Sequence, residues 1–464
     1  MSDPLPAPPH PLAGLAPPPD PGPSLLSLLF CPPANMFEAF PREAYEVPVF
    51  RPRRMPSLLV VVSDPDAVRR VMLDEVADFP RHAQSDEIFS AMFGEGLLGV
   101  TGETWRRHRR ILAPAFGPRS IAALAPVMTD AAAAWVERWA ALAGAAPVDM
   151  AAEMKGVGLK IVSDTMFSAG ADELTALANG ALSVLQDELR LGLPDALPLL
   201  GPLIRQRKYA RVRREIVRFD AAIDRMIGER ERDPAAAPED LLSRLMAARD
   251  GEDGAGLTAK EVRDEVVTIF EAGHETTASA LTFAWYLLAH HPAEEARLQA
   301  ELDGVLGGRL PTAADVPSLP YTRMVIEETM RLYPPVPTIA ARTARRDCEI
   351  CGVPVRAGQR VFVTPWIIHR HRALWDAPER FDPERFSPER SAGRPRFAYL
   401  PFGAGPRVCI GAGFAMMEAT LVLAALAQRF RARMLPGHRV RLRAQLTLGP
   451  IGGLPMTLEA RRPG

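Results

Sequence analysis

The stretch FGAGPRVCIG, Phe402 to Gly411, places one cysteine among three glycines and a proline. Cys409 is one of only four cysteines in 464 residues. Four cysteines in a chain of this length are not a disulfide framework, and they are typical of a reducing compartment. The setting of Cys409 is therefore the feature that most needs an explanation.

Three roles fit this cysteine. It can be a buried structural residue, a nucleophile whose base lies elsewhere in the sequence, or an axial thiolate ligand to haem iron. Glycines allow backbone N–H groups to approach the sulfur closely and stabilise its charge. Arg407, two residues before Cys409, can pair with a haem carboxylate in a bidentate way. Taken alone, the residues leave the three roles open.

Composition excludes several classes of protein. The chain is 47% hydrophobic and 24% charged with a net charge of -1, which argues against a nucleic acid partner. It has no secretory signal pattern and no run of roughly 18 apolar residues. We expect a cytoplasmic protein without a membrane anchor.

The composition also predicts the domain organisation. Residues 1–56 are expected to form a proline-rich arm, extended or disordered. Residues 57–464 are expected to form one mainly helical domain with a minor β region.

Strand patterns lie at both ends of this domain. SLLVVV, residues 57–62, predicts a buried strand followed by a helix that starts at DPDAVRRVML. CEICGVPVRAGQRVFVTP, residues 348–365, alternates apolar and polar residues around glycines and predicts paired strands. LTLGPIGGLPMTLEA, residues 446–460, predicts a closing hairpin.

The segment AGHETT, residues 272–277, lies inside a long helical pattern. Thr258 and Glu261 resemble a capping box at the start of that helix. At about 100° per residue, Gly273 and Thr276 share one face of the helix. The glycine has no side chain, so it leaves space beside the threonine hydroxyl. The same pattern also fits ordinary helix packing, with the threonine hydroxyl bonded back to a carbonyl.

The spacing F-x-x-G-x-x-x-C-x-G around Cys409 resembles the haem-binding loop of the cytochrome P-450 superfamily. Three further motifs follow the order of that family: W-x-x-x-R, AGHETT and E-x-x-R. The resemblance implies that Cys409 is the proximal ligand of haem b. It also implies a cofactor-binding set of Trp105, Arg109, Arg342, Phe402, Gly403, Arg407 and Gly411. For WRRHRR, residues 105–110, a solvated basic helix with one core tryptophan is the alternative.

AGHETT resembles the distal helix motif of the family, A/G-G-x-D/E-T-T/S. In the family, this glycine gives room for dioxygen and the acid–alcohol pair governs proton delivery. The resemblance therefore implies that Glu275 and Thr276 are catalytic.

The pair Glu328 and Arg331 would, as a bare E-x-x-R, indicate a surface ion pair worth about 0.5 kcal/mol. FDPERF follows at residues 381–386. The family pairs these motifs, which implies a buried charge network of Glu328, Arg331 and Arg385. Its role is structural rather than catalytic.

Two apparent metal motifs are rejected. Cys348-x-x-Cys351 resembles half of a zinc or redox site, but no second pair accompanies it. His369 and His371 lie two apart, where the family commonly has H-R-D. The histidine at 371 in place of an aspartate leaves the local hydrogen bonding open.

The resemblance implies monooxygenation, in which one atom of O2 enters a hydrophobic substrate and the other leaves as water. Trp105 with FDPERF, and Glu275 rather than aspartate, resemble the fatty-acid-hydroxylase and eukaryote-like branch. A peroxide-driven enzyme and a haem sensor or carrier are the alternatives, and the intact AGHETT motif argues against both. The resemblance implies a substrate pocket lined by the following residues, each of which plain core packing would also explain: Phe89, Met92, Phe93, Leu97, Leu98, Phe270, Val336, Ile339 and Ile451.

Electrons are expected from NAD(P)H through a separate ferredoxin and ferredoxin reductase. Because the sequence ends at Gly464, soon after the closing strand pattern, we expect no fused reductase domain, and we expect a monomer. Arg106, Arg107 and Arg110 are expected to be available for docking an acidic ferredoxin, with Arg109 turned towards a propionate.

Overall fold

The computed structural model describes residues 40–52, 59–168, 201–339, 341–444 and 446–461, together with Phe37 and Leu177. Most of the arm expected at residues 1–56 lies outside these residues, as does Cys31. The chain groups into two compact units: Met1–Ser85, Ile121–Val157 and Glu275–Gly464 form the first, and Asp86–Ser120 and Gly158–His274 form the second. The start of the haem domain at residue 57 stays a prediction.

Strand β2, Leu59–Val62, confirms the strand predicted from SLLVVV, because its three valines are fully buried. It lies in a four-stranded sheet of the first unit with the order β1-β2-β7-β4. Strand β1 (Val49–Phe50) pairs with β2 in antiparallel fashion, whereas β7 (Arg360–Val363) runs parallel to β2. Strand β4 (Arg342–Thr343) completes the sheet next to β7.

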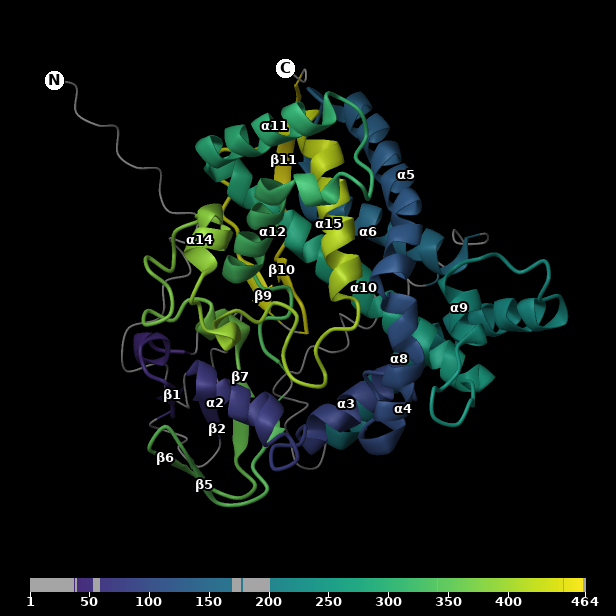
Figure 1. Cartoon of the computed structure of the whole chain (residues 1–464), viewed down its shortest axis with the longest axis vertical. Helices are drawn as coiled ribbons and strands as arrows, with labels where there is room; N and C mark the ends of the chain where they lie inside the picture. The colour runs from purple at the N-terminus through teal and green to yellow at the C-terminus, as the bar shows by residue number, and fades with distance from the viewer. Residues whose placement is uncertain are drawn as a thin grey trace. The chain divides into compact units, whose positions relative to one another are not determined.

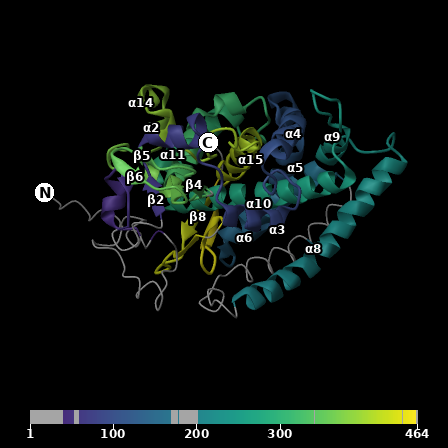
Figure 2. The same cartoon turned by 90° about the horizontal axis from the view of Figure 1, so that it is seen from below.

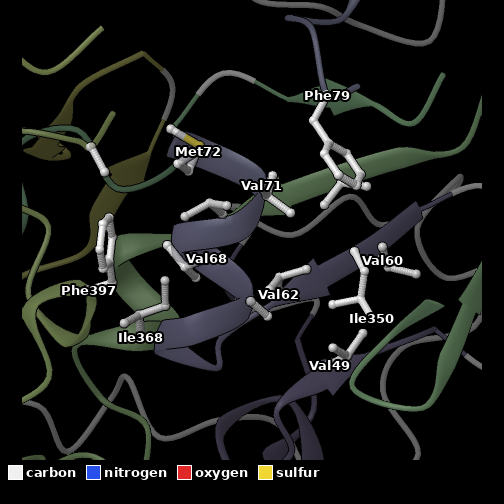
Figure 3. Close-up of a cluster of buried hydrophobic side chains, with 14 of the residues drawn as sticks. Val49, Val60, Val62, Val68, Val71, Met72, Phe79, Ile350, Ile368 and Phe397 are labelled. Atoms are coloured by element: carbon white, nitrogen blue, oxygen red, sulfur yellow. The ribbon is translucent and has the colours of Figure 1, made fainter. Parts of the chain in front are cut away.

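Helix α2, Pro65–Arg69, starts where the sequence predicts it. The Asp64 side chain caps it by accepting the backbone N–H groups of residues 66 and 67 at 3.1 and 2.9 Å. The helix continues into a π-helical turn, Arg70–Asp74. Figure 3 shows the side chains of this segment meeting those of the sheet in one apolar cluster, which includes Val60, Val62, Val68, Val71, Met72 and Phe79.

The two predicted strand pairs have different outcomes. Strands β5 (Cys348–Ile350) and β6 (Val353–Val355) form the expected hairpin. Its two turn residues, Cys351 and Gly352, have φ of +48° and +76°, a combination that a two-residue I′ turn requires.

The prediction of a closing hairpin at residues 446–460 was wrong. Strand β10 (Leu448–Pro450) pairs with β9 (Leu442–Ala444), whereas β11 (Pro455–Ala460) pairs with β8 (Phe430–Met434) and β3 (Val148–Asp149). Asp149 accepts the backbone N–H of Leu454 at 2.7 Å. This contact holds the chain that enters β11 against β3 instead of letting it fold back on β10.

Buried helices form the rest of the first unit. Helices α11 (Pro292–Leu306), α12 (Pro320–Leu332) and α15 (Ala412–Ala427) pack side by side (Figure 1). From Glu418 onward, every residue of α15 is buried. The short helices α13 (Pro365–Ile368) and α14 (Pro388–Ser391) belong to the same unit.

Helix α10, Ala259–His290, confirms the long helix predicted around AGHETT. Its capping box forms: Glu261 accepts the backbone N–H of Thr258 at 2.8 Å, and Thr258 Oγ1 accepts that of Glu261 at 3.2 Å. Figure 2 shows the helix along its length. Residues up to His274 belong to the second unit and those from Glu275 to the first.

The second unit also contains most of α3 (Ala83–Phe93), α4 (Gly102–Leu112), most of α6 (Met150–Phe167), α8 (Gly201–Arg232) and α9 (Leu241–Ala247). Most of α5 (Pro118–Leu142) belongs to the first. Within the described residues, no single helix has both the length and the apolar character of a membrane span. One pair bent by 58°, Gly102–Phe116 with Pro118–Leu142, meets those criteria jointly, by length and composition only.

Candidate functional site

The loop that carries Cys409 is closed by backbone hydrogen bonds. The N–H of Cys409 donates to the carbonyl of Phe402 at 2.9 Å, and the N–H of Val408 donates to that of Gly405 at 3.1 Å. Helix α15 starts three residues after Cys409, with Gly411 as its N-cap. The cysteine is exposed. A thiolate at a helix N-terminus is stabilised by the helix dipole, so the loop suits an anionic sulfur ligand.

The loop rests on the π-helical turn of the first unit. Gly405 has a φ of +71°, and a Cβ built there would lie 1.8 Å from the carbonyl oxygen of Met72. Only glycine permits both this backbone conformation and this approach. The cysteine loop therefore packs directly against the backbone of residues 72–73.

Two arginines of the first unit were expected to bind haem propionates, and this role stays a prediction. Arg342, on β4, is only 5% exposed, and Arg407 is half-buried in the cysteine loop. The neighbouring Thr343 Oγ1 lies 2.9 Å from His82 Nδ1. A buried guanidinium and an exposed thiol at a helix N-terminus fit a cofactor that offers iron and carboxylates. Phe402 and Gly403 are half-buried in the same loop.

Trp105 and Arg109 lie one turn apart on α4 and are both half-buried. They belong to the second unit. Their role as propionate ligands stays a prediction.

Glu275 and Thr276 are half-buried on α10. The alternative that the threonine hydroxyl only bonds back to a carbonyl stays open. Gly273 has a clear packing role, because a Cβ there would lie 3.0 Å from Cγ2 of Val162 on α6. This glycine therefore lets α6 and α10 approach closely.

Glu418 is a buried acid that the sequence analysis missed. It lies on α15, nine residues after Cys409, and is fully buried. Burial raises the pKa of its carboxyl well above the usual value, and the neighbouring Thr277 hydroxyl opposes this shift only in part. The one available signal was an acid inside the otherwise apolar run AMMEATLVLAALA, residues 415–427.

We predict that Glu418→Gln stabilises the protein, and more so at high pH. The pKa of the folded state is raised, so the unfolded chain loses its proton from about pH 4.3 upward while the folded chain keeps it. This cost to stability grows by up to about 1.4 kcal/mol per pH unit until the folded pKa is reached. The amide of the variant avoids this cost because it does not titrate.

Denaturant unfolding of the holoenzyme at pH 5.5, 7 and 8.5 measures this difference. The free energy gained by the variant is expected to rise with pH. A gain that is the same at all three pH values contradicts a neutral Glu418.

The predicted buried charge network is confirmed. Arg331 contacts both carboxylate oxygens of Glu328, at 2.6 and 2.8 Å, and both side chains are fully buried. Arg385 Nε lies 3.5 Å from Glu328 Oε1. The remaining donors of Arg331 bind the carbonyls of residues 369, 378 and 380. The pair thus fixes the meander that precedes the cysteine loop.

His369 and His371 have structural roles. His369 Nε2 accepts the N–H of Leu400 at 2.7 Å, and burial lowers the pKa of this ring to about 3. His371 Nδ1 accepts the N–H of Ala373 at 3.3 Å, as an aspartate would, and Nε2 donates to the carbonyl of Val47 at 3.1 Å. This second contact accounts for a histidine at that position. Among the described residues, no group of three His, Cys, Asp or Glu could hold a metal ion.

The expectation that three arginines of α4 are available to a partner needs correction. Arg107 binds Glu261 at 2.9 Å, and Arg110 binds Asp250 at 2.9 Å. Both arginines thus hold α4 to other segments of the second unit. Arg106 is exposed but pairs with Glu103. Sequence spacing did not reveal these acids, because Glu261 follows Arg107 by 154 residues and Asp250 follows Arg110 by 140 residues.

The described geometry agrees with comparisons to known proteins. A family profile described as Cytochrome P450 matches residues 16–451. "Cyclooctatin synthase" of Streptomyces melanosporofaciens is 38% identical over 78% of this chain and 79% of its own length. "Cyclooctat-9-en-7-ol 5-monooxygenase" of the same organism is 36% identical over 88% and 87%.

A solved structure, "Crystal structure of cytochrome P450DA heme domain", is similar with a TM-score of 0.77 and 28% identity over 90% of each chain. The fold is thus the mainly helical one of these enzymes, with a small strand component. The chain belongs to the cytochrome P450 family, and it is a haem-thiolate monooxygenase that oxidises hydrophobic organic substrates with O2.

Proposed function

We propose that this enzyme hydroxylates a cyclic terpenoid, either a hydrocarbon or an alcohol derived from one. The observation that carries the proposal is the 36% identity, over 88% of the chain, to a relative whose name specifies oxidation of cyclooctat-9-en-7-ol, a cyclic unsaturated alcohol. The apolar residues expected by resemblance to line the pocket suit such a substrate.

The proposed cofactor is haem b, with Cys409 as its thiolate ligand. The haem, when bound, supplies the activation of dioxygen. Gly403 and Gly411 are proposed to shape the loop around the sulfur and Phe402 to pack against the haem, with its carbonyl accepting the N–H of Cys409. Arg342 and Arg407 of the first unit, with Trp105 and Arg109 of the second, are proposed to bind its propionates.

Proton delivery is assigned to α10. The Thr276 hydroxyl is proposed to hold a water molecule, and Glu275 to exchange protons with solvent. Thr282, on the same helix, has its hydroxyl bonded back to the carbonyl of Ala278 at 2.7 Å. It offers a matched control, because it is a buried threonine with a purely local hydrogen bond.

We predict that Thr276→Ala keeps substrate binding and electron uptake but loses coupling. General acid–base groups contribute typically 10²–10⁴-fold, so product formed per NADPH is expected to fall about tenfold or more, with hydrogen peroxide released instead. Product, peroxide and NADPH are measured in the same reaction. Thr276→Ser is expected to restore coupling and Thr282→Ala to leave it unchanged. Equal coupling in Thr276→Ala and wild type rules out the role.

Electrons are proposed to come from NAD(P)H through a separate ferredoxin and ferredoxin reductase. Of the three arginines on α4, Arg106 is the one whose ion pair stays within its own helix, and we propose that it contributes to steering. We also propose that the protein is a monomer and that it is located in the cytoplasm. The free thiols of Cys348 and Cys351 favour a reducing compartment.

The test is turnover of a panel of cyclic terpene hydrocarbons, cyclic terpene alcohols and fatty acids, with a ferredoxin and its reductase as electron source. We expect a Soret shift on binding, and a product that carries one atom from ¹⁸O2, for at least one cyclic terpenoid. Turnover of fatty acids alone contradicts the substrate class. Turnover with peroxide but not with NADPH contradicts the electron source.

A further inference from the structure

The loop Gly94–Gly99 of the second unit is bound to α10 by two neighbouring acids. Asp264 accepts the backbone N–H of Glu95 at 2.8 Å, and Glu265 accepts that of Leu97 at 3.0 Å. Hydrogen bonds to a carboxylate are roughly twice as strong as neutral ones. The register of the loop along the helix is therefore set by two side chains.

The loop also fits α10 without room for side chains at its glycines. A Cβ at Gly96 would lie 2.0 Å from Oγ1 of Thr268, which is bonded to the carbonyl of Asp264 at 2.8 Å. A Cβ at Gly99 would lie 2.1 Å from the carbonyl oxygen of Gly94. Displacement of this loop would thus break a close packing as well as two hydrogen bonds.

Glu265 is itself held by a buried histidine. Its other oxygen lies 2.8 Å from Nδ1 of His108, whose Nε2 lies 3.1 Å from Oε1 of Glu261. His108 and Glu265 are both fully buried. Both ring nitrogens thus lie within hydrogen-bond distance of a carboxyl oxygen, an arrangement that favours a positive charge on the ring, although burial also raises the pKa of Glu265. Burial opposes this charge, but the bonds to Glu265 and Glu261 prevail and raise the pKa of His108.

Other charged groups surround the pair. Arg107 on α4 binds Glu261, and Lys260 and Arg263 on α10 both bind Asp264. Asp224 on α8 lies 3.4 Å from Arg263. Charges taken out of water are costly unless they are paired. Burying Glu265 and His108 together to fix the Leu97 amide therefore costs considerable free energy. Closing the loop alone would not require that cost.

We propose that Glu265, held by His108, is a positioning residue that fixes the loop Gly94–Gly99 and thereby sets the affinity for bulky apolar ligands through Leu97 and Leu98. The proposal rests on the proposed function, in which these leucines line the substrate pocket. Glu265 itself touches the loop backbone and not the substrate. Its influence on binding passes through the position of the loop.

The experiment combines amide exchange with ligand titration in the holoenzyme. Clotrimazole, a bulky apolar azole that ligates haem iron, is the probe, so the result does not depend on the terpenoid substrate. In Glu265→Leu, we expect the Leu97 amide to exchange about tenfold faster and clotrimazole to bind about tenfold more weakly. The carbon monoxide spectrum is expected to be unchanged. Glu265→Gln keeps an oxygen for the Leu97 N–H and is expected to restore both.

Asp240→Asn is the control. Asp240 is a buried carboxylate that pairs with Arg230 and caps α9 through the N–H of Ser243. Its loss is expected to lower stability without changing Leu97 exchange or azole affinity. If Asp240→Asn weakens azole binding as much as Glu265→Leu, the effect is one of general stability and the proposal is wrong.

Gly96→Ala keeps the test decisive if Glu265→Leu fails to bind haem. It displaces the loop while both acids remain, and it is expected to weaken clotrimazole binding to a similar degree. Wild-type azole affinity in a variant with a loosened Leu97 amide overturns the role in binding. Wild-type protection of that amide in Glu265→Leu overturns the anchor itself. A failure to oxidise any terpenoid would leave both readouts intact and would refute only the proposed function.

Discussion

Cys409→Ala is expected to abolish the red-shifted carbon monoxide band that marks thiolate-ligated haem, together with all turnover. The sulfur lies three residues before the start of α15, and alanine has no atom that can bind iron. The measurement is the carbon monoxide difference spectrum of the reduced protein. A variant that retains the band would show that Cys409 is not the ligand.

Cys348→Ser and Cys351→Ser are the controls. Both residues belong to the β5–β6 hairpin, where Cys348 is part of a strand and Cys351 occupies the turn. Neither substitution is expected to alter the carbon monoxide band. Loss of the band in either of them would indicate that the thiolate signature depends on more than the cysteine loop.

Gly405→Ala is expected to prevent haem incorporation. The new Cβ would meet the Met72 carbonyl at 1.8 Å, and backbone cannot move aside as a flexible side chain can. Either the cysteine loop or the π-helical turn beneath it must then shift, which displaces Cys409 from its place. The measurement is haem content per chain after purification, from the Soret absorbance.

Gly403→Ala is a matched control for that substitution. Gly403 has a φ of +75°, close to that of Gly405, but nothing lies within 4 Å of its added Cβ. We expect only the backbone penalty of about 1–2 kcal/mol, with haem retained. Equal haem content in the two variants would show that positive φ, and not contact with Met72, makes glycine necessary at position 405.

Local patterns predicted the elements that depend on neighbours in sequence. The buried strand β2, the capping box of α10 and the strand pair of β5 with β6 all follow from residues a few positions apart. The charge network of Glu328 was also expected, because resemblance linked E-x-x-R with FDPERF. The first three features each have their physical cause within a short motif, whereas the charge network joins distant segments and was expected from the resemblance alone.

Features that depend on distant partners could not be read in the same way. The acids that engage Arg107 and Arg110 follow more than one hundred residues later, and no local pattern marks them. The same holds for His108 and Glu265. Strand β10 carries a normal hairpin pattern beside β11, but β10 pairs with β9 and β11 pairs with β8 and β3, and the contact of Asp149 with Leu454 holds the start of β11 near β3.

The parallel pairing of β2 with β7 has a consequence for the order of folding. The valines of β2 are made early, but their partners at residues 360–363 follow about 300 residues later in the chain. During synthesis, at about 5–20 residues per second, this apolar strand waits for its partner, whereas the segments of the second unit end at His274. Such late, long-range pairing is slow and exposed to aggregation. Production of this enzyme is therefore expected to benefit from chaperones that shield its N-terminal strand until β7 has been made.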